Sequence, residues 1–333
     1  MNPLFLLLLL APLAVVALVG RSPRRLRVHL RAWPSIAVLY IRAASGMLLK
    51  PGRLPATVTR VAPIEVSVGV ASEVDGQRLA NFQRLVQGPN HPQHVPIMYF
   101  IVEAFRLAMA VLFHPAFPVS VAGAVLARYT LVLTRNVQVH EKLLHSCSVD
   151  TTVRHTDKGD IEFDLISTAT TAAAGDVVWR STLTILLINP KRVKAAKPAA
   201  GASKGVGVKI SGELIDTWHL GGDAGRRYAS LNGDYNPIHL FPITAKLFGF
   251  RRPIAHALFL LARAVSAIET KHGLDMKGGW EMESEFKRPT LLPATLGCYV
   301  GPKKEGAEGA IDFSIGTEDG LKEVLTGTLK RLG

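Results

Sequence analysis

The segment of this 333-residue chain best suited to chemistry brings a carboxylate, an amide and an imidazole within six residues, at Asp234, Asn236 and His239. Pro237 restricts Asn236 to extended backbone geometry and has no backbone N–H, so we predict a bent loop instead of a continuous helix. A bent loop can direct all three side chains at one point. Because an apolar site can move the pKa of either group toward neutrality, Asp234 and His239 can share the general acid and base roles.

Two helices are predicted after this loop, where they would hold it in place. Pro242 suits the first turn of a short helix that ends at Gly249, and Pro253 opens a second helix that runs to about Glu269. The second helix is apolar on nearly every side, which indicates a helix surrounded by other structure. The backbone N–H groups of its first turn, near Ala257, lack intrahelical partners and are suited to stabilise a developing oxyanion.

The loop and the start of the second helix carry a recognisable set of residues: Tyr228-Ala229, Gly233-Asp234, Asn236-Pro237-Ile238-His239, Ala245, Gly249 and Pro253-Ile254-Ala255-His256. This set resembles the signature of the MaoC-like (R)-specific enoyl-thioester hydratases and dehydratases, the hydratase 2 group, which has the hot-dog fold. The family usually has glycine directly after the second histidine. Here that position is Ala257, which keeps the main-chain N–H and adds a methyl group.

The resemblance implies reversible hydration of 2-enoyl thioesters, or dehydration of (R)-3-hydroxyacyl thioesters, in fatty-acid metabolism. It makes Asp234 and His239 the pair that holds and activates water, with Asn236 as their support. It assigns the substrate and oxyanion side of the site to Asn236, Gly233, His256 and Ala257. No cofactor and no metal are expected, because the sequence has no dinucleotide fingerprint, no phosphate loop and no metal-ligand spacing.

The expected partner is an acyl thioester of coenzyme A or of acyl carrier protein. Lys246, Arg251 and Arg252 are candidates for contacts with its phosphates, although a solvated helix surface explains them equally well. The formal net charge of +13 favours phosphate-bearing or acidic partners. Nucleic acid is not expected, because basic and aromatic residues are not interleaved in a recognition motif.

Two similar halves are predicted on either side of a basic linker at 190–207. In each half, 61–189 and 208–333, an apolar helix opened by Pro-Ile precedes several runs with the alternation typical of strands. We therefore predict an α+β fold of two tandem hot-dog units, each a curved antiparallel sheet around an apolar helix. Two units in one chain already supply the pairing that single hot-dog chains obtain by dimerising, so both a monomer and a homodimer remain open.

The two predicted halves differ in their chemistry. The sequence before the first apolar helix contains His91 and His94, but no aspartate stands five residues ahead of either. We therefore expect the second half to be catalytic. By the resemblance, the first unit would help to form the tunnel for the acyl chain.

The first twenty residues contain no charged side chain, and five arginines follow at Arg21, Arg24, Arg25, Arg27 and Arg31. This pattern predicts a single-pass transmembrane anchor at 1–20 with the catalytic part facing the cytoplasm, the alternative being a cleaved signal peptide. Within a basic and interfacial segment at 21–60, the apolar stretch 32–49 either lies on a bilayer surface or packs on the protein. Two distant cysteines suggest a reducing compartment.

Two rival functions remain open from sequence alone. A hot-dog thioesterase would usually need an acidic residue on or near the central helix, and the second apolar helix has none before Glu269. A non-catalytic, membrane-tethered module that binds acyl thioesters is the other. Turnover of a 2-enoyl thioester distinguishes all three, because only a hydratase removes the conjugated double bond.

Overall fold

The computed structural model describes residues 25–89, 93–189, 209–274, 278–302 and 309–333. The N-terminal half contains β1 (Leu26–Leu30), α2 (Ile36–Leu49), β2 (Ile64–Val68), α3 (Gly76–Val86), α4 (Phe100–Leu112), β3 (Val125–Leu133), β4 (Leu143–Val149), β5 (Arg154–His155), β6 (Ile161–Thr171) and β7 (Val177–Leu187). The C-terminal half contains β8 (Glu213–Leu220), α6 (Ala224–Asn232), the 3-10 helix η3 (Pro237–His239), α7 (Pro242–Leu247), α8 (Ala257–His272), β9 (Trp280–Phe286), β10 (Ala294–Val300), β11 (Ala310–Thr317) and β12 (Glu323–Arg331).

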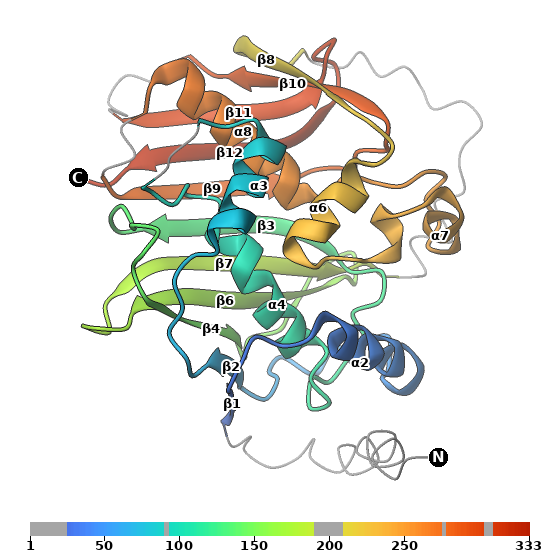
Figure 1. Ribbon diagram of the computed structural model, residues 1–333. Helices are drawn as coiled ribbons and strands as arrows, with labels where there is room; N and C mark the ends of the chain where they lie inside the picture. Colours follow the sequence, from blue (N-terminus) through green and yellow to red (C-terminus); the bar gives the residue numbers. More distant parts are fainter. Residues whose placement is uncertain (1–24, 90–92, 190–208, 275–277, 303–308) are drawn as a thin grey trace.

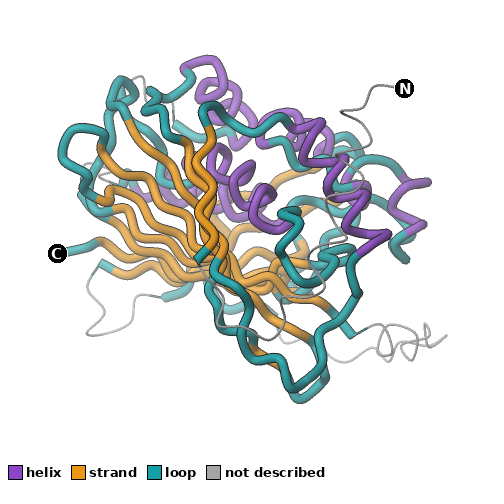
Figure 2. The backbone as a smooth tube through the Cα atoms, turned by 90° about the horizontal axis from the view of Figure 1, so that it is seen from below, coloured by secondary structure: helices purple, strands orange, loops and turns teal. Residues whose placement is uncertain are grey.

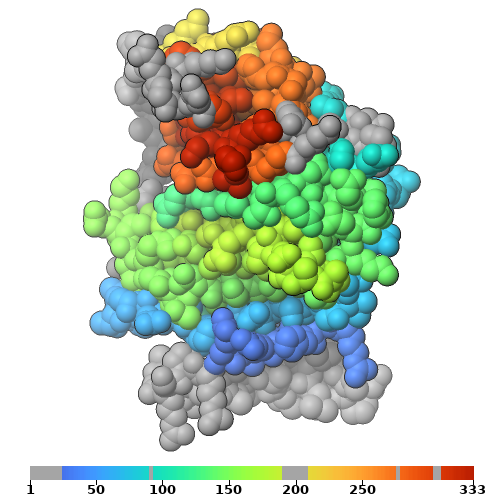
Figure 3. All heavy atoms as spheres, turned by 90° about the vertical axis from the view of Figure 1, so that its left-hand side faces the viewer, coloured from blue at the N-terminus to red at the C-terminus, as the bar shows by residue number. Residues whose placement is uncertain are grey.

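The strands form one sheet in the order β1-β2-β4-β6-β7-β3-β9-β12-β11-β10-β8, with β5 paired to β6. Antiparallel pairing of β3 with β9 joins the two halves, and the hydroxyl of Ser284 donates to the carbonyl of Tyr129 across this seam at 3.0 Å. The helices lie on one side of the sheet (Figures 1 and 2). Figure 3 shows the C-terminal half, in orange and red, stacked directly on the green N-terminal half.

Alternation in the sequence explains the strands. In β6, Ile161, Phe163 and Leu165 are buried, while Glu162 and Asp164 between them point the other way and pair with an arginine of β5. Side chains two residues apart line the same side of a strand, so this pattern gives the sheet one apolar side. The helices pack against that side.

The two long apolar helices, α4 and α8, form the centre of the molecule. Ten of the 13 residues of α4 and 12 of the 16 residues of α8 are buried, as their lack of a polar side predicted. Helix α8 begins at Ala257, four residues later than predicted. The preceding segment is extended because the N–H of Ile254 donates to the carbonyl of Ile238 at 3.0 Å and the N–H of Ala255 to that of Thr290 at 2.8 Å.

The segment before residue 61 also belongs to the fold. Strand β1 pairs in parallel with β2, and α2 packs on the protein through its buried residues Leu39 and Ala43. Other apolar residues of α2 remain exposed, including Ile41 at 62% and Leu48 at 86%. Strand β1 and helix α2 thus pack on the first half of the chain, ahead of residue 61.

The predicted localisation, a single-pass membrane anchor with a cytoplasmic catalytic part, requires correction. Among the residues that the structure describes, no helix combines the length and apolarity needed to cross a bilayer. The longest of these helices, α8, spans about 24 Å at 1.5 Å per residue, against a hydrocarbon core of roughly 30 Å. The segment 1–20, the linker 190–207 and His91, all part of the sequence predictions, lie outside the described residues.

Candidate active site

A short loop between α6 and η3 carries the predicted catalytic residues. Gly233 ends α6 with a φ of +85°, a conformation that favours glycine, and a Cβ there would lie only 3.0 Å from the Cδ1 of Ile36. The N–H of Asp234 donates to the Oδ1 of Asn232 at 2.9 Å, and the Oδ1 of Asp234 accepts from the N–H of Asn236 at 3.2 Å. These local bonds hold the loop in its bent form.

Asn236 has a local role. Its Oδ1 accepts from the N–H of Ile238 at 3.4 Å, which caps the start of η3. Asn236 also lines the cavity described below. Asn236 thus shapes the turn beside Asp234 and His239, and its supporting role in catalysis stays a prediction.

His239 is fixed by its partner on the strand-like segment before α8. Its Nδ1 lies 2.8 Å from the carbonyl oxygen of Ile254. A backbone carbonyl can only accept, so we assign the proton to Nδ1, which leaves Nε2 as an acceptor. The buried imidazole can thus take a proton from a water molecule at Nε2.

His256 connects the loop to the start of α8. Its Nε2 donates to the carbonyl oxygen of Asp234 at 3.0 Å and lies 3.6 Å from the Oδ2 of the same residue. Its ring stacks on that of His239, with centroids 3.7 Å apart, and also contacts the ring of Tyr228, with centroids 5.0 Å apart. The resemblance assigned His256 to the substrate side, and these contacts add a positioning role for Asp234.

Burial dominates the electrostatics of the three titratable groups. It raises the pKa of Asp234, while the charge of His239 acts to lower it. Burial lowers the pKa of His239, which the carboxylate of Asp234 acts to raise. The pKa of His256 falls well below its usual value because of burial and the nearby His239. Both imidazoles are therefore neutral near pH 7, and the carboxyl of Asp234 is brought closer to that range.

The start of α8 supplies a hydrogen-bond donor to the same space. The N–H groups of Phe259 and Leu260 donate to the carbonyl of His256, at 3.1 and 3.2 Å. Ala257 is the first residue of the helix, so its N–H has no intrahelical partner, and the residue lines the cavity. The N-cap His256 makes no side-chain capping bond. The amide of Ala257 is thus available to an oxyanion in the cavity.

A cavity of about 690 Å³ opens onto this cluster. Asp234 is the only carboxylate among the described residues that line it. Its other walls are largely apolar and include residues of the N-terminal half, among them Phe105, Met109, Leu165, Leu183 and Ile185. A long apolar cavity with a few convergent polar groups at one place suits a chain-like apolar substrate with a reactive polar group.

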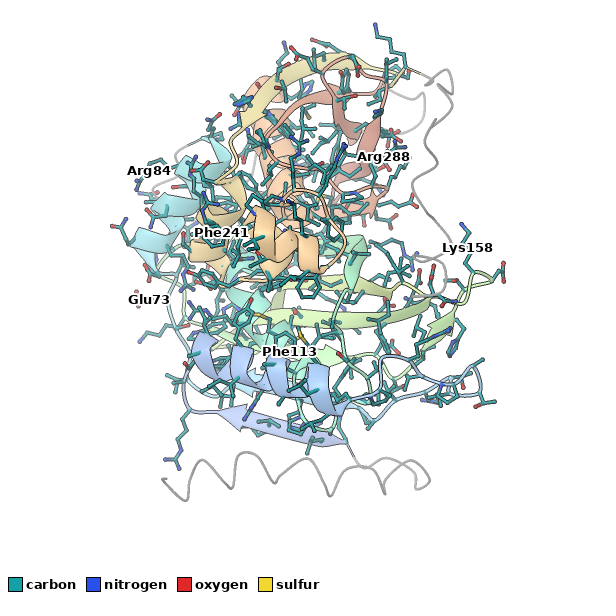
Figure 4. All side chains as sticks on the ribbon, turned by 90° about the vertical axis from the view of Figure 1, so that its right-hand side faces the viewer. Glu73, Arg84, Phe113, Lys158, Phe241 and Arg288 are labelled. Carbon is teal, nitrogen blue, oxygen red and sulfur yellow. The ribbon has the colours of Figure 1, made fainter. Side chains whose placement is uncertain are left out.

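The three predicted phosphate contacts lie outside this cavity. Lys246, on α7, and Arg251 and Arg252, in the turn after it, are exposed and are not among the lining residues. The cations that line the cavity are instead Lys287 and Arg288, directly after β9, Arg42 of α2, and Lys50, directly after α2. Figure 4 shows Arg288 and Phe113 on the side of the molecule from which α2 is seen.

Sequence reasoning missed these cations for different reasons. The stretch Phe286-Lys287-Arg288-Pro289 resembles the family and is therefore a usable signal, but the sequence alone does not place it at the cavity. Nothing in the sequence of α2 places it near the motif. Only the folded chain brings the two together.

The same cluster has the composition of a metal site. One ligand atom each from Asp234, His239 and His256 lie within 4.8 Å of one another, and two imidazoles with a carboxylate suit a divalent transition metal. However, each imidazole already donates one ring N–H to a backbone carbonyl. These bonds orient the rings and leave the other ring nitrogen of each imidazole free to accept a proton or to bind a metal. That no metal is needed stays a prediction.

A curved sheet over two apolar helices is the arrangement of a hot-dog fold. Residues 213–306 match the family model for the MaoC like domain. The C-terminal part of the chain is thus a MaoC-like dehydratase domain and the protein is a hydro-lyase, which confirms the class predicted from the motif.

Individual relatives agree with this class. The chain is 27% identical over 282 residues to 3-hydroxyacyl-thioester dehydratase X of Mycobacterium tuberculosis, covering 83% of this chain and 90% of the relative. The crystal structure of HtdX from the same organism aligns with a TM-score of 0.65 at 25% identity, over 80% of this chain and 100% of that chain. A 38-residue segment is 58% identical to peroxisomal enoyl-CoA hydratase 2 of Arabidopsis thaliana, covering 11% of this chain and 12% of that protein.

Proposed function

We propose that the protein catalyses the reversible hydration of 2-enoyl thioesters to (R)-3-hydroxyacyl thioesters, carried on coenzyme A or a carrier protein. The observation that carries this proposal is the placement of Asp234 and His239 beside the free N–H of Ala257 in one apolar cavity. The name of the mycobacterial relative, a 3-hydroxyacyl-thioester dehydratase, supports the same substrate class.

The geometry suggests a separate role for each group in the reaction. In hydration, a water molecule between the two side chains gives a proton to the Nε2 of His239 as its oxygen adds to the β carbon. The carbonyl oxygen gains negative charge, which the N–H of Ala257 and the positive end of α8 stabilise. Asp234, with its raised pKa, delivers a proton to the α carbon. Dehydration reverses each step.

The N-terminal half has a different part in the proposal. We assign to it a second hot-dog unit that lacks the catalytic pair and encloses the acyl chain. Its helix α4 and strands β6 and β7 contribute cavity walls, including Phe105, Leu165 and Leu183. A contact between α2 and the catalytic loop also supports a part for the N-terminal half in the site. The hydroxyl of Tyr40 donates to the carbonyl of Gly233 at 3.4 Å.

Assays with crotonyl and longer 2-enoyl thioesters test the proposal. Loss of absorbance from the conjugated double bond indicates hydration, release of free thiol indicates a thioesterase, and binding without turnover indicates a binding module. Asp234→Asn and His239→Ala are expected to abolish most of the hydration, whereas Asp157→Asn, on an exposed loop, is the matched control. A wild-type protein without turnover, or full activity in both active-site variants, would exclude the proposed function.

A further inference from the structure

Helix α2 and the residue directly after it present three residues to the cavity: Arg42, Gly46 and Lys50. Arg42 and Gly46 are four residues apart and so lie on one side of the helix, while Lys50 follows the end of the helix in extended conformation. The side chain of Lys50 folds back along the helix over Gly46, because a Cβ on Gly46 would lie 3.7 Å from the Cδ and 4.0 Å from the Nζ of Lys50. The ammonium group is thereby brought toward Arg42.

These cations have no acidic partner. The Nζ of Lys50 donates to the carbonyl of His114 at 2.7 Å and lies 5.8 Å from the ring centroid of Phe117. Within the described part of the chain, no carboxylate lies within ion-pair distance of Arg42 or Lys50. Burial lowers the pKa of Lys50 to about 8, and burial together with the charges of Arg42 and Lys50 lowers that of His114 to about 4. The cavity wall therefore carries uncompensated positive charge.

The position of these cations relative to the catalytic loop follows from α2. Tyr40, near the start of the helix, contacts Gly233. Gly46, over which the ammonium of Lys50 lies, is six residues further along, or about 9 Å at 1.5 Å per residue. Phe113, which also lines the cavity, lies directly above α2 in Figure 4. The ammonium of Lys50 thus lies about 9 Å along α2 from the residue that contacts the catalytic loop, and Arg42 lies between the two.

We propose that Arg42 and Lys50 form a binding site for an anionic oxygen group of the substrate while the acyl group reacts at Asp234 and His239. Two unpaired cations on an apolar wall are stabilised by a carboxylate or phosphate, which accepts strong charge-assisted hydrogen bonds. A thioester offers this chemistry in two places: a carboxylate at the far end of the acyl chain, or the phosphates of the thioester carrier. This inference rests on the proposed function for the nature of the substrate.

Kinetics with four substrates separate these sources. They are two 2-enoyl chains of equal length, one ending in a methyl group and one in a carboxylate, each carried on coenzyme A and on pantetheine, which lacks the phosphates. If the acyl chain supplies the anion, Arg42→Gln/Lys50→Met lowers kcat/KM roughly 10- to 100-fold for both carboxylate-ended substrates only. If the carrier supplies it, the loss affects both coenzyme A substrates and neither pantetheine substrate. An equal loss on all four, or no loss on any, overturns the proposal.

Controls separate charge from folding. Lys158→Met removes an exposed lysine that Figure 4 shows projecting from the far edge of the molecule, and it is expected to leave all four rates unchanged. Lys50→Arg keeps the charge and is expected to retain the discrimination between substrates. If the double variant does not fold, wild type and Lys50→Arg still give the preference for anionic substrates, and its absence in both contradicts the site.

Calorimetry with saturated, non-reacting thioesters of the same four types tests the anion site separately from catalysis. The wild type is expected to bind the anionic form roughly 10-fold more tightly, and the double variant is expected to lose this difference. That result supports the site even if no thioester is hydrated, in which case the proposed function alone fails. Equal affinities for forms with and without the anion count against the site whether or not turnover occurs.

Discussion

Each half of the molecule contains a buried acid–imidazole pair, and the two pairs differ in what surrounds them. In the N-terminal half, the carboxylate of Glu103 on α4 lies 3.6 Å from the Nε2 of His145, with side chains only 8% and 2% exposed, and neither residue lines the cavity. In the C-terminal half, Asp234 and His239 line the cavity beside an open helix start. The two pairs therefore contain the same kinds of group and differ in access to the cavity and in the donor that lies beside them.

The N-terminal pair is enclosed by aromatic side chains. The hydroxyl of Tyr99 donates to the Oε1 of Glu103 at 3.2 Å, and the ring of Trp33 contacts that of His145 with centroids 5.3 Å apart. Burial raises the pKa of Glu103 to about 7 and lowers that of His145 to about 4. Burial thus favours the uncharged form of both groups, and neither of them lines the cavity.

The largest expected effect is the loss of kcat/KM when Asp234 or His239 is replaced. Replacement of the enclosed Glu103 should cause no such loss. Loss of a general acid or base typically costs about 10²- to 10⁴-fold, so Asp234→Asn and His239→Ala should each lower kcat/KM by that factor. Glu103→Gln, which keeps an acceptor for Tyr99, should change kcat/KM less than about threefold, because Glu103 does not line the cavity. Steady-state hydration rates measure both. Equal losses in the two halves would mean that the enclosed pair is also catalytic.

The next effect isolates the helix start. Proline is tolerated at the first position of a helix but has no N–H, so Ala257→Pro should keep α8 and remove the oxyanion donor. We expect kcat to fall roughly 100-fold, equivalent to about 3 kcal/mol. The backbone of His256 is already extended, with ψ of 128°, as the residue before proline requires. Ala257→Gly, which keeps the donor, is the control, and circular dichroism checks the fold. An unchanged kcat in Ala257→Pro would exclude this amide as the donor.

A smaller effect concerns the stability of the enclosed pair. Burial raises the pKa of Glu103 from 4.5 to about 7, so between these values the unfolded chain loses a proton that the folded chain retains, and stability falls as pH rises. Glu103→Gln removes this penalty and should raise the free energy of unfolding at pH 8 by about 3 kcal/mol, with no such gain at pH 4. Urea denaturation at both pH values measures it. Glu73→Gln, at an exposed position, is the control, and a gain independent of pH would contradict the assignment.

The smallest expected effect is none. Because the imidazoles of His239 and His256 are oriented by backbone carbonyls, hydration should continue at an unchanged rate after dialysis against a chelator. Restoration of a lost rate by one added divalent ion would show that the Asp234 cluster works as a metal site. Activity before and after dialysis, with metal analysis of the protein, gives the answer.

Local sequence signals predicted the central helices, most strands and the bent form of the loop at Asp234, because each depends on nearby residues. The apolar sides of α8 and the proline after Asn236 are properties of short segments. The stacking of His256 on His239 and the contact of Tyr40 with Gly233 depend on segments far apart in the chain. Such contacts arise only when the sheet places α2 and α8 around one cavity, so sequence periodicity could not reveal them.

The pairing of β3 with β9 has a practical consequence for work with fragments. Either half expressed alone would expose a long unpaired strand with free N–H and C=O groups along its edge, and such edges readily join a second copy. A lone C-terminal half should therefore self-associate through β9, which would restore a neighbouring strand but not the walls that Phe105 and Leu183 give to the cavity.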